Sequence, residues 1–345
     1  MKLPPLVSII ILNWNGGEIL KDCLTSLSKI TYPNWELILV DNGSTDGSEK
    51  QIKLTKAAKH TLLIKNKKNL GFAEGNNQGF KKTKGKYILL LNNDTKVEKN
   101  FLTILLERLE PDENLGAIQP KILIMDKPSH LDSIGSFLTR TGFLQHDGFL
   151  AKDSKQFNHE KYVFSAKGAC MLVKREVIEK VGLFDKEFGS YFEETDFCWR
   201  VWLAGYKILY YPKTHVYHKV GFTSKQFSQI DVNYHSFKNR IASLFKNLGA
   251  LNLVTIGGTH LAILMGLSVY FLLTFRFKEA GIVTKAILWN IQNLPGLTEK
   301  RRGVQARRKI DDKELFQTIL KPFDYSSMFR HFLRAQKVLG GEHEV

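Results

Sequence analysis

Three short polar segments each follow an apolar run in the first hundred residues, and their side chains are of kinds that bind nucleotides. The segment 41–48 begins with Asp41, whose carboxylate can accept hydrogen bonds from a base N–H or a ribose hydroxyl. The segment 69–79 offers glycines and amides ahead of an expected helix, whose N-terminus favours anions. The segment 92–95 carries two amides and Asp94, a hard oxygen ligand that suits Mg²⁺ or Mn²⁺. Each segment alone is also an ordinary turn or cap, but together they indicate a site for a nucleoside diphosphate.

A cluster of acids around position 194 could supply a general base. Glu193, Glu194 and Asp196 precede an apolar helical stretch at 197–203, and aromatic residues surround them. Aromatic neighbours withdraw a carboxyl group from water and so raise its pKa, which suits a proton acceptor. Acids in the first turn of a helix are also frequent as caps and as partners of the helix dipole. Both interpretations remain open at this point.

A histidine could complete a metal site with Asp94. His218 follows Tyr217, and a neutral imidazole is a common ligand of divalent metals. A histidine beside a tyrosine is often only structural, and His215 is a competing candidate. The expected cofactor is therefore Mg²⁺ or Mn²⁺, with Asp94 as one protein ligand and either histidine as a candidate for the other.

The elements that must position these residues alternate between strands and helices. Apolar, β-branched runs predict strands at 7–12, 36–40, 61–64 and 87–91. Helical spacing predicts helices at 19–27, from about 48, and at 73–82. This alternation predicts an α/β fold whose parallel sheet is covered by helices on both faces. In such a sheet the binding crevice lies beyond the carboxyl ends of the strands, where the three polar segments occur.

The composition fits an ordinary folded chain of 345 residues with an excess of positive charge. Hydrophobic residues make up 43% and charged residues 24%, and the formal net charge is +16. These values exclude wholesale disorder and point to anionic partners: nucleic acid, a phosphorylated substrate or an anionic membrane surface. A recognisable basic and aromatic module for nucleic acid is absent from the sequence, so no nucleic-acid partner is expected. The three cysteines form no disulfide or zinc pattern, which indicates a reducing compartment.

Residues 247–275 carry no charged side chain and are numerous enough to cross a bilayer. Basic residues flank the stretch on both sides, at 238–246 and 276–285, and cationic segments resist translocation. This arrangement favours a re-entrant or interfacial element over a single span, continued by an amphipathic pattern at 282–294. The protein is therefore expected at the cytoplasmic face of the inner or plasma membrane, bound to anionic lipids.

Residues 6 to about 224 resemble glycosyltransferase family 2, and in particular its bacterial rhamnosyltransferase-like members. The resemblance rests on the run Val-Ser-Ile-Ile-Ile-Leu-Asn-Trp-Asn-Gly at 7–16, on Asp-Asn-Gly-Ser-Thr-Asp-Gly-Ser at 41–48, and on Asn-Leu-Gly-Phe at 69–72. It implies a GT-A fold, with a mostly parallel central sheet and flanking helices, and a nucleotide-sugar donor. The expected division is a donor-binding half at 1–115, an acceptor-binding and catalytic half at 116–228, and a helical, hydrophobic and basic membrane-associating tail at 229–345.

By this resemblance the strand ends of the first half would bind the donor. Asp41 would contact the nucleobase with Asn15 nearby, while Asp46, Asn69 and Gly71 would line the donor pocket. The expected donor-binding residues are Asn13, Asn15, Asp41, Asn42, Ser44, Asp46, Asn69, Gly71, Phe72, Asn76, Asn92, Asn93 and Glu193.

The segment 92–94 lies where the family has its Asp-x-Asp metal motif. Asn92 replaces the first aspartate, so Asp94 is the expected metal ligand and Asn92 would bind the ribose or diphosphate. The segment 216–221 resembles the place where many members of the family have a metal-binding histidine, which makes His218 the expected second ligand. Glu194 takes the position of the family's catalytic base, with Asp196 as the alternative base or a partner of Arg200. The expected acceptor-binding residues are Gly168, Ala169, Cys170, Trp199 and Arg200.

The sequence therefore predicts an inverting glycosyltransferase that serves cell-surface polysaccharide synthesis and acts on a lipid-linked or glycan acceptor. The alternatives are a catalytically impaired sugar-binding or scaffold protein, suggested by Asn92, a nucleotidyltransferase, and a basic nucleic-acid-binding protein. A processive polymer synthase is less favoured, because the sequence has no Gln-x-x-Arg-Trp motif. The prediction requires that Asp94 and Glu194 face one cavity.

Overall fold

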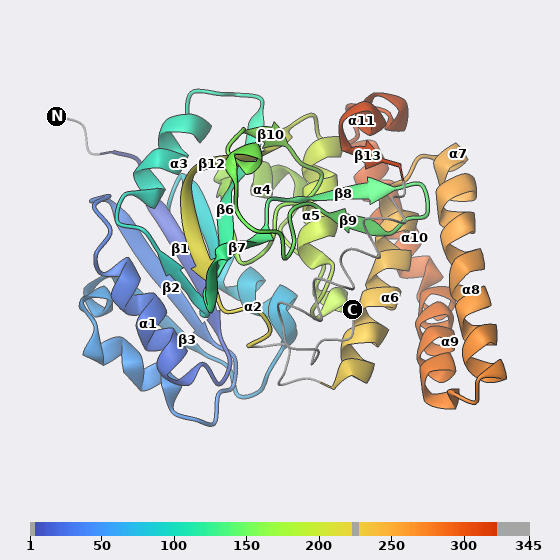
Figure 1. The fold of residues 1–345 in the computed structure, drawn as a ribbon, viewed down its shortest axis with the longest axis horizontal. Helices are drawn as coiled ribbons and strands as arrows, with labels where there is room; N and C mark the ends of the chain where they lie inside the picture. The colour runs from blue at the N-terminus through green and yellow to red at the C-terminus, as the bar shows by residue number, and fades with distance from the viewer. Residues whose placement is uncertain (1–3, 223–227, 323–345) are drawn as a thin grey trace.

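The computed structural model describes residues 4–222 and 228–322. A twisted sheet with helices on both faces forms the body of the molecule, and a group of helices from the last third of the chain lies against one side of it (Figure 1). The fold is thus α/β, as predicted, with an additional C-terminal helical region.

The central sheet has ten strands, and the half formed by the N-terminal part of the chain is parallel. Its main order is β10 (Lys161–Tyr162), β12 (Lys207–His218), β6 (Leu115–Ile124), β11 (Cys170–Lys174), β4 (Tyr87–Asn92), β1 (Val7–Asn13), β2 (Trp35–Asp41) and β3 (Thr61–Lys65), with β5 (Thr95–Val97) paired to β12 and β7 (Lys127–Ser133) paired to β6. The ladders joining β4, β1, β2 and β3 are parallel, as the sequence predicts. Strand β11 is antiparallel to both of its neighbours, so the whole sheet is mixed.

The strands of the parallel half form because their residues are apolar on both faces. In β1 every residue from Val7 to Ile11 is buried, and helices cover both sides. Helices α1 (Gly17–Leu27) and α3 (Phe101–Leu109) pack on one face, while α2 (Gly71–Phe80), α4 (Arg175–Val181) and α5 (Glu193–Leu203) pack on the other. Helix α2 lies very close to β1: a Cβ at Gly75 would be 2.3 Å from a methyl carbon of Leu12.

The prediction of a helix from about residue 48 is only partly right. The structure has two short 3₁₀ helices there, η1 (Ser48–Leu54) and η2 (Lys56–His60). Thr55 between them has extended backbone angles, and its hydroxyl donates to the carbonyl of Ile52. Threonine competes for backbone hydrogen bonds in this way, which explains why a continuous α-helix does not form.

The C-terminal region begins with the long helix α6 (Gln229–Asn247), which packs directly on the body. Behind it stand α7 (Ala250–Asn252), a π-helical turn (Leu253–Gly257), α8 (Gly258–Leu273), α9 (Phe277–Gln292), α10 (Leu294–Ala306) and α11 (Asp312–Ile319). Residues 250–273 form one continuous helix, and among the described residues it alone is long and apolar enough to cross a membrane. Helices α8 and α9 lie side by side at the outer edge of the molecule (Figure 1).

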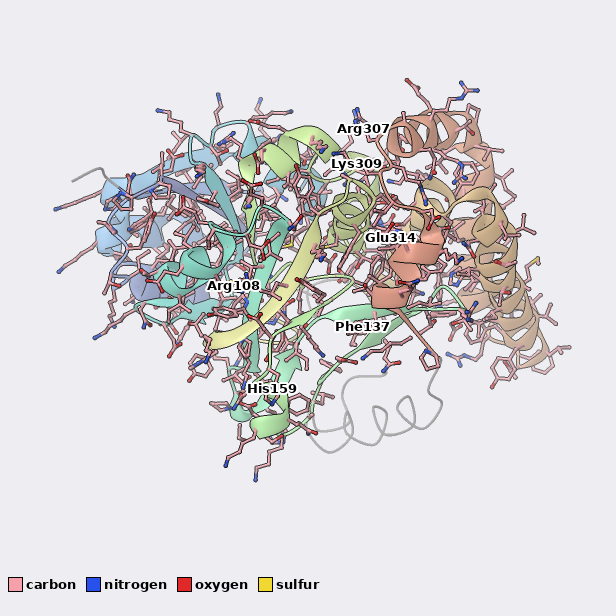
Figure 2. The ribbon with its side chains drawn as sticks, turned by 90° about the horizontal axis from the view of Figure 1, so that it is seen from above. Arg108, Phe137, His159, Arg307, Lys309 and Glu314 are labelled. Atoms are coloured by element: carbon pink, nitrogen blue, oxygen red, sulfur yellow. The ribbon has the colours of Figure 1, made fainter. Side chains whose placement is uncertain are left out.

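The last described residues return to the body. Strand β13 (Leu320–Lys321) pairs with β8 (Ser136–Thr139), and β8 pairs with β9 (Leu144–His146) to make a small second sheet. Figure 2 shows this junction from above, with Glu314 of α11 beside the strand that carries Phe137. The C-terminal region is therefore tied to the body at α6 and again at β13.

Two details of the tail differ from the sequence interpretation. The basic residues that precede the apolar stretch are buried in the protein: Lys246 pairs with Asp185 and Asp196, and Lys238 donates to the carbonyl of Glu187. On α9, which packs against α6 and α8, Ile282 and Ala286 are buried. Apolar side chains on α8 and at other positions of α9 are exposed. Packing of α9 against α6 therefore determines which face of α9 is exposed to solvent.

Candidate functional site

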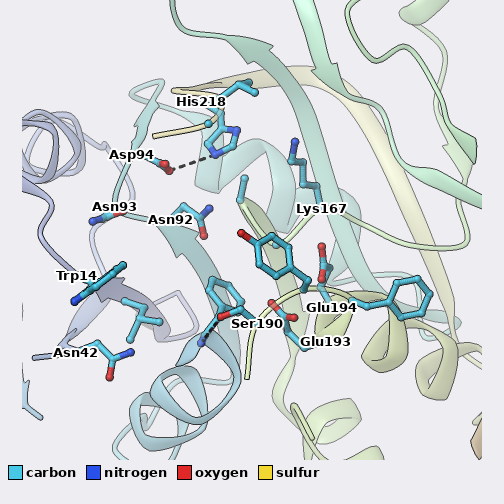
Figure 3. A pocket seen from close by; sticks show the side chains of 18 of the residues that line it. Trp14, Asn42, Asn92, Asn93, Asp94, Lys167, Ser190, Glu193, Glu194 and His218 are labelled. Atoms are coloured by element: carbon cyan, nitrogen blue, oxygen red, sulfur yellow. Dashed lines mark hydrogen bonds and ion pairs between the residues drawn. The ribbon is translucent and has the colours of Figure 1, made fainter. Parts of the chain in front are cut away.

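A cavity of about 390 Å³ opens at the carboxyl ends of β1 and β4 (Figure 3). Asp94 and Glu194 both line it, as the sequence prediction requires. The expected site residues that line it are Asn42, Asn69, Phe72, Asn92, Asn93, Asp94, Gly168, Ala169, Glu193, Glu194 and His218. Residues from the beginning and the middle of the chain thus meet at the place where the sheet topology predicts a ligand.

Asn13 at the end of β1 holds the neighbouring turns together beneath the cavity. Its Nδ2 donates to Asp41 Oδ1 at 3.1 Å and to Ser48 Oγ at 2.8 Å. A third bond from Nδ2 reaches Ser44 Oγ at 3.2 Å. Its Oδ1 accepts from Asn93 Nδ2 at 2.9 Å. Asn13 and Asp41 are buried and bonded to protein groups, and neither lines the cavity.

Two further expected donor residues also tie the turns together. Asn15 Oδ1 accepts from the backbone N–H of Thr45 at 2.8 Å. Asp46 accepts from the backbone N–H groups of Gly17 and Ser48, both at 2.9 Å. Neither side chain lines the cavity.

The segment after β3 forms the next wall. Asn42 Nδ2 donates to Asn69 Oδ1 at 2.9 Å, and both amides line the cavity. Gly71 has φ of +83°, and a Cβ there would lie 2.8 Å from the carbonyl oxygen of Gly189, so glycine is required by both conformation and space. Asn76 donates to the carbonyl of Phe72 within α2 and does not line the cavity.

Asp94 and His218 face each other at one end of the cavity (Figure 3). His218 Nε2 lies 3.3 Å from Asp94 Oδ1, and His218 Nδ1 lies 2.8 Å from Asp132 Oδ2. Asp132 also accepts from Lys167 Nζ at 2.6 Å. Burial alone would lower the pKa of His218, but Asp94 and Asp132 outweigh burial and raise the pKa to about 9. The same end therefore holds two carboxylates and two cationic groups in alternation.

Asp94 and His218 fit a divalent metal ion, whose binding would displace the proton from the His218 imidazole. Asp94 Oδ1 is buried without a hydrogen-bond donor and faces His218 Nε2. The contact of Nδ1 with Asp132 is the carboxylate–histidine arrangement that orients metal-binding imidazoles. No group of three or more His, Cys, Asp or Glu side chains is placed to hold an ion within residues 4–222 and 228–322. Two protein ligands leave the remaining positions for diphosphate oxygens and water, as is usual for Mg²⁺.

The competing histidine lies elsewhere. His215 Nε2 is 3.0 Å from Tyr217 Oη, and His215 Nδ1 is 3.2 Å from Glu98. It does not line the cavity. Since side chains alternate along a strand, His215 and His218 point to opposite faces of β12.

The first turn of α5 forms the opposite end of the cavity. Tyr191 and Phe192 just before it both have φ of +71°, a left-handed conformation that is strained for aromatic residues. Asn239 of α6 holds this turn through Nδ2, which donates to the carbonyls of Phe188, Ser190 and Tyr191. The turn aims the start of α5 at the cavity.

Glu193 and Glu194 each have one carboxylate oxygen without a hydrogen-bond partner among the described residues. The Oε2 atom of each is buried and accepts no hydrogen bond from the described residues. Burial raises the pKa of both groups, and the charge of Glu194 raises that of Glu193 further. A carboxylate that water and protein solvate poorly is well prepared to accept a proton from a bound hydroxyl.

Asp196 faces the other way and does not line the cavity. It accepts from Arg200 Nε at 3.0 Å and from Asn247 Nδ2 at 2.9 Å, and Lys246 Nζ lies 3.1 Å away. Its pKa is lowered, because these cations outweigh complete burial. The side chain therefore stabilises the contact between α5 and α6 and is not placed to act as the alternative base.

Three expected acceptor-binding residues also lie outside the cavity. Arg200 donates to the carbonyls of Val181, Gly182 and Leu183 besides its bond to Asp196. Trp199 is buried with its ring against Phe164, and Cys170 is buried within β11. Of the expected acceptor set, Gly168 and Ala169 remain at the cavity.

Sequence reasoning missed several cavity residues. Trp14 and Lys167 are adjacent in sequence to residues that it selected, so proximity was an available signal. Ser190 lines the cavity and accepts from the backbone N–H of Phe72. Asp132 lies on β7, whose register on β6 is irregular, and no sequence pattern marks it.

Comparison with known proteins agrees with this geometry. Residues 8–182 match the family model described as glycosyl transferase family 2. A poly-β-1,6-N-acetyl-D-glucosamine synthase of Staphylococcus aureus is 25% identical over 208 residues, which cover 60% of this chain and 48% of the relative. The chain thus spans about half the length of the curated relatives it matches.

Two solved structures share the fold over most of the chain. A mannosyltransferase from Pyrobaculum calidifontis, in complex with GDP-Man and Mn²⁺, has a TM-score of 0.54 at 14% identity, covering 96% of this chain and 84% of that one. Residues 1–349 of TarS from S. aureus, in complex with UDP-GlcNAc, also give a TM-score of 0.54 at 14% identity, covering 87% and 88%. The predicted GT-A-like architecture, including its C-terminal helical region, is confirmed.

Proposed function

Because the chain belongs to glycosyl transferase family 2, we propose that it moves a sugar from a nucleoside-diphosphate sugar to an alcohol in the synthesis of a cell-surface polysaccharide. The observation that carries this proposal is the placement of Asp94 with His218 at one end of a single cavity and of Glu194 at the other. The first pair suits the diphosphate of a donor, and the second suits a hydroxyl acceptor.

Different residues bind the donor and activate the acceptor in a single nucleophilic displacement at the anomeric carbon. The amides of Asn42, Asn69 and Asn92 offer hydrogen bonds to the donor. Glu194 takes the proton of the acceptor hydroxyl as its oxygen bonds to the anomeric carbon; the bond from that carbon to the diphosphate breaks, and the nucleoside diphosphate leaves with the electron pair. Attack from the opposite face inverts the anomeric carbon. A divalent ion held by Asp94 and His218 would neutralise charge on the diphosphate.

The donor is best identified by a binding screen. We expect one nucleotide sugar from a panel that includes dTDP-rhamnose, UDP-GlcNAc and GDP-mannose to raise the melting temperature, because a ligand stabilises the state that binds it. The rise should be larger with Mn²⁺ than with EDTA. A panel without any stabilising nucleotide sugar would contradict the proposal.

The acceptor is proposed to be lipid-linked or glycan, at the cytoplasmic face of the plasma membrane. The support is an exposed apolar surface on α8, α9 and the loop between them, where Leu273, Phe275 and Phe277 are 74%, 79% and 62% exposed. Arg276, Lys278 and Lys285 are exposed beside it and can bind anionic lipid head groups. Such a surface suits a peripheral or re-entrant helix hairpin.

Vesicle binding tests this assignment. We expect the double substitution Leu273→Glu and Phe275→Glu to abolish co-sedimentation with phosphatidylglycerol vesicles. Leu54, 68% exposed on η1 in the body, offers a matched control, and Leu54→Glu should sediment like wild type. Equal sedimentation of all three proteins would reject this surface as the membrane contact.

A further inference from the structure

A second cavity of about 320 Å³ adjoins the first. Lys167, Tyr191, Phe192 and Glu194 line both cavities. Glu194, the proposed base, therefore stands at the boundary between a donor space and a second space on its other side. A single displacement needs the acceptor hydroxyl beside the base and opposite the leaving group, so the second cavity is the place from which an acceptor can reach Glu194.

Arg240 of α6 gives the second cavity a positive charge that no carboxylate of the described residues pairs with. Its Nε is buried without a hydrogen-bond acceptor, and Nη2 has only a 3.4 Å contact with Ser236 Oγ. No carboxylate of residues 4–222 or 228–322 pairs with it. Its guanidinium lies over the rings of Phe143 and Phe192, with 4.7 Å and 5.3 Å to their centroids. Burial lowers the pKa of Arg240 to about 10, which still leaves the group charged at neutral pH.

The carboxylates that line this cavity belong to Asp132 and Glu194, and neither forms an ion pair with Arg240. Asp132 is already bonded to Lys167 and His218. Ser133 and Ser136 line the same space and offer hydroxyl groups. A buried cation without a partner is costly to keep, whereas an arginine that meets a phosphate gains charge-assisted hydrogen bonds. The cavity thus has the chemistry of an anion site next to groups that suit a sugar.

The position of Arg240 in the fold indicates what carries the anion. Helix α6 packs on one side against the body and on the other against α9, whose partner α8 bears the exposed apolar surface. The cluster beside Arg240 contains Ile241, Leu264 and Phe143, and it continues into α8 and α9. Phe143, over whose ring Arg240 lies, packs in this cluster, so one apolar cluster connects the anion site with the helices that bear the exposed apolar surface. The volume of about 320 Å³ suits one sugar with its phosphate rather than a long glycan.

We propose that the second cavity binds the acceptor and that Arg240 binds the diphosphate of a prenyl-diphosphate-linked sugar, whose hydroxyl then lies at Glu194. This assignment rests on the proposed sugar transfer. It makes Arg240, together with Lys167, the determinant of acceptor class, and it gives α6 a binding role in addition to its packing role.

Isothermal titration with geranyl diphosphate in EDTA tests the proposal on the full chain. We expect Arg240→Gln to weaken binding about 10- to 100-fold, the range for a lost hydrogen-bonded charge. Arg240→Lys should recover part of the affinity. Arg302→Gln removes the same charge from an exposed position of α10 and should leave the affinity unchanged. Equal melting temperatures of the variants show that they are folded.

Each control compound excludes a different explanation. Geraniol should not bind, and inorganic pyrophosphate should bind more weakly than geranyl diphosphate. Equal affinity for both diphosphates would overturn the lipid part of the assignment. Equal affinity of Arg240→Gln and Arg302→Gln for geranyl diphosphate would overturn the role of Arg240, and so would displacement of geranyl diphosphate by the nucleotide sugar, which would place the ligand in the donor space.

Donor binding separates this proposal from the one on which it rests. Wild type and Arg240→Gln should be stabilised equally by the nucleotide sugar found in the panel. If no nucleotide sugar binds wild type, sugar transfer fails as a function whatever Arg240 does. If the donor binds and the affinity for geranyl diphosphate is the same in wild type and Arg240→Gln, only the acceptor site is rejected.

Discussion

The turns after β1 and β2 and the first turn of α5 border the same cavity, but their polar groups are arranged differently. In the turns, Asn13 uses both atoms of its amide for bonds to Asp41, Ser48 and Asn93. In α5, Glu193 and Glu194 each keep a buried carboxylate oxygen without a partner. The polar groups of the first region are hydrogen-bonded to protein, whereas each carboxylate of the second has an oxygen that is free to bind a ligand.

This difference separates positioning from chemistry. A polar side chain whose bonds are all taken by protein stabilises one geometry and has nothing left for a substrate. A buried carboxylate without partners costs stability and is kept where a ligand will meet it. From this contrast we infer that Asn13 belongs to the framework of the site and Glu194 to the reacting atoms, and each assignment makes a measurable prediction.

The largest effect is expected for Glu194→Gln. Removing the proton acceptor should lower kcat about 10²- to 10⁴-fold, while the donor affinity remains close to that of wild type. Asp196→Asn is the matched control two residues away: it should lower the melting temperature, because it weakens a buried ionic cluster, and leave kcat per folded molecule close to wild type. A Glu194→Gln enzyme with wild-type kcat would contradict the assignment of Glu194 as the proton acceptor.

Asp94→Asn should have the next largest effect. It removes one of two metal-binding side chains, and we expect Mn²⁺ affinity in the presence of donor to fall about 100-fold, as measured by titration calorimetry. His215→Gln supplies the control, since His215 lies outside the cavity. Comparable losses of Mn²⁺ affinity in both variants would contradict the assignment of Asp94 and His218 as the metal ligands.

Asn13→Ala tests the hydrogen-bonded turns. Because Asp41, Ser48 and Asn93 would lose a buried partner at once, we expect the free energy of unfolding to fall by about 2 kcal/mol in a urea titration. Transfer by the folded fraction should change far less than in Glu194→Gln. A loss of kcat without a loss of stability would mean that Asn13 acts on the substrate.

Glu193→Gln should give the smallest effect, a stabilisation whose size depends on pH. Burial raises the pKa of Glu193 in the folded protein, so the folded state keeps a proton that the unfolded chain releases above the ordinary pKa of about 4.3. Wild-type stability therefore declines as the pH rises through that window. Glutamine removes the decline, and its stabilisation relative to wild type should be absent near pH 4 and present at pH 8.

Much of this architecture could be predicted because its causes are local. β-Branched apolar runs fix β1 to β4, and parallel strands bring their polar ends to one edge of the sheet. Helix periodicity also contained unused information: at about 100° per residue, Asp196 lies about 200° around α5 from Glu194 and must face away from it. Arg200, one turn beyond Asp196, faces away for the same reason.

Other parts of the site depend on long-range packing. Asp132 reaches His218 because β7 folds back on β6 with an irregular register, and Arg240 reaches Phe192 because α6 returns from the tail. Nothing near these residues in the sequence specifies such contacts. The strained pair Tyr191 and Phe192 is likewise stabilised by distant residues rather than by its own conformational preferences.

The bonds from Asn239 to the carbonyls of Phe188, Ser190 and Tyr191 have a consequence for where this enzyme can be cut. The family match ends at residue 182, and the turn that aims Glu194 comes after it. Asn239, which holds that turn, lies on α6 after residue 228. A fragment that ends before α6 would keep the residues of the cavity but lose the hydrogen bonds that orient Glu194. Catalytic competence is thus a property of the body and its helical appendage jointly.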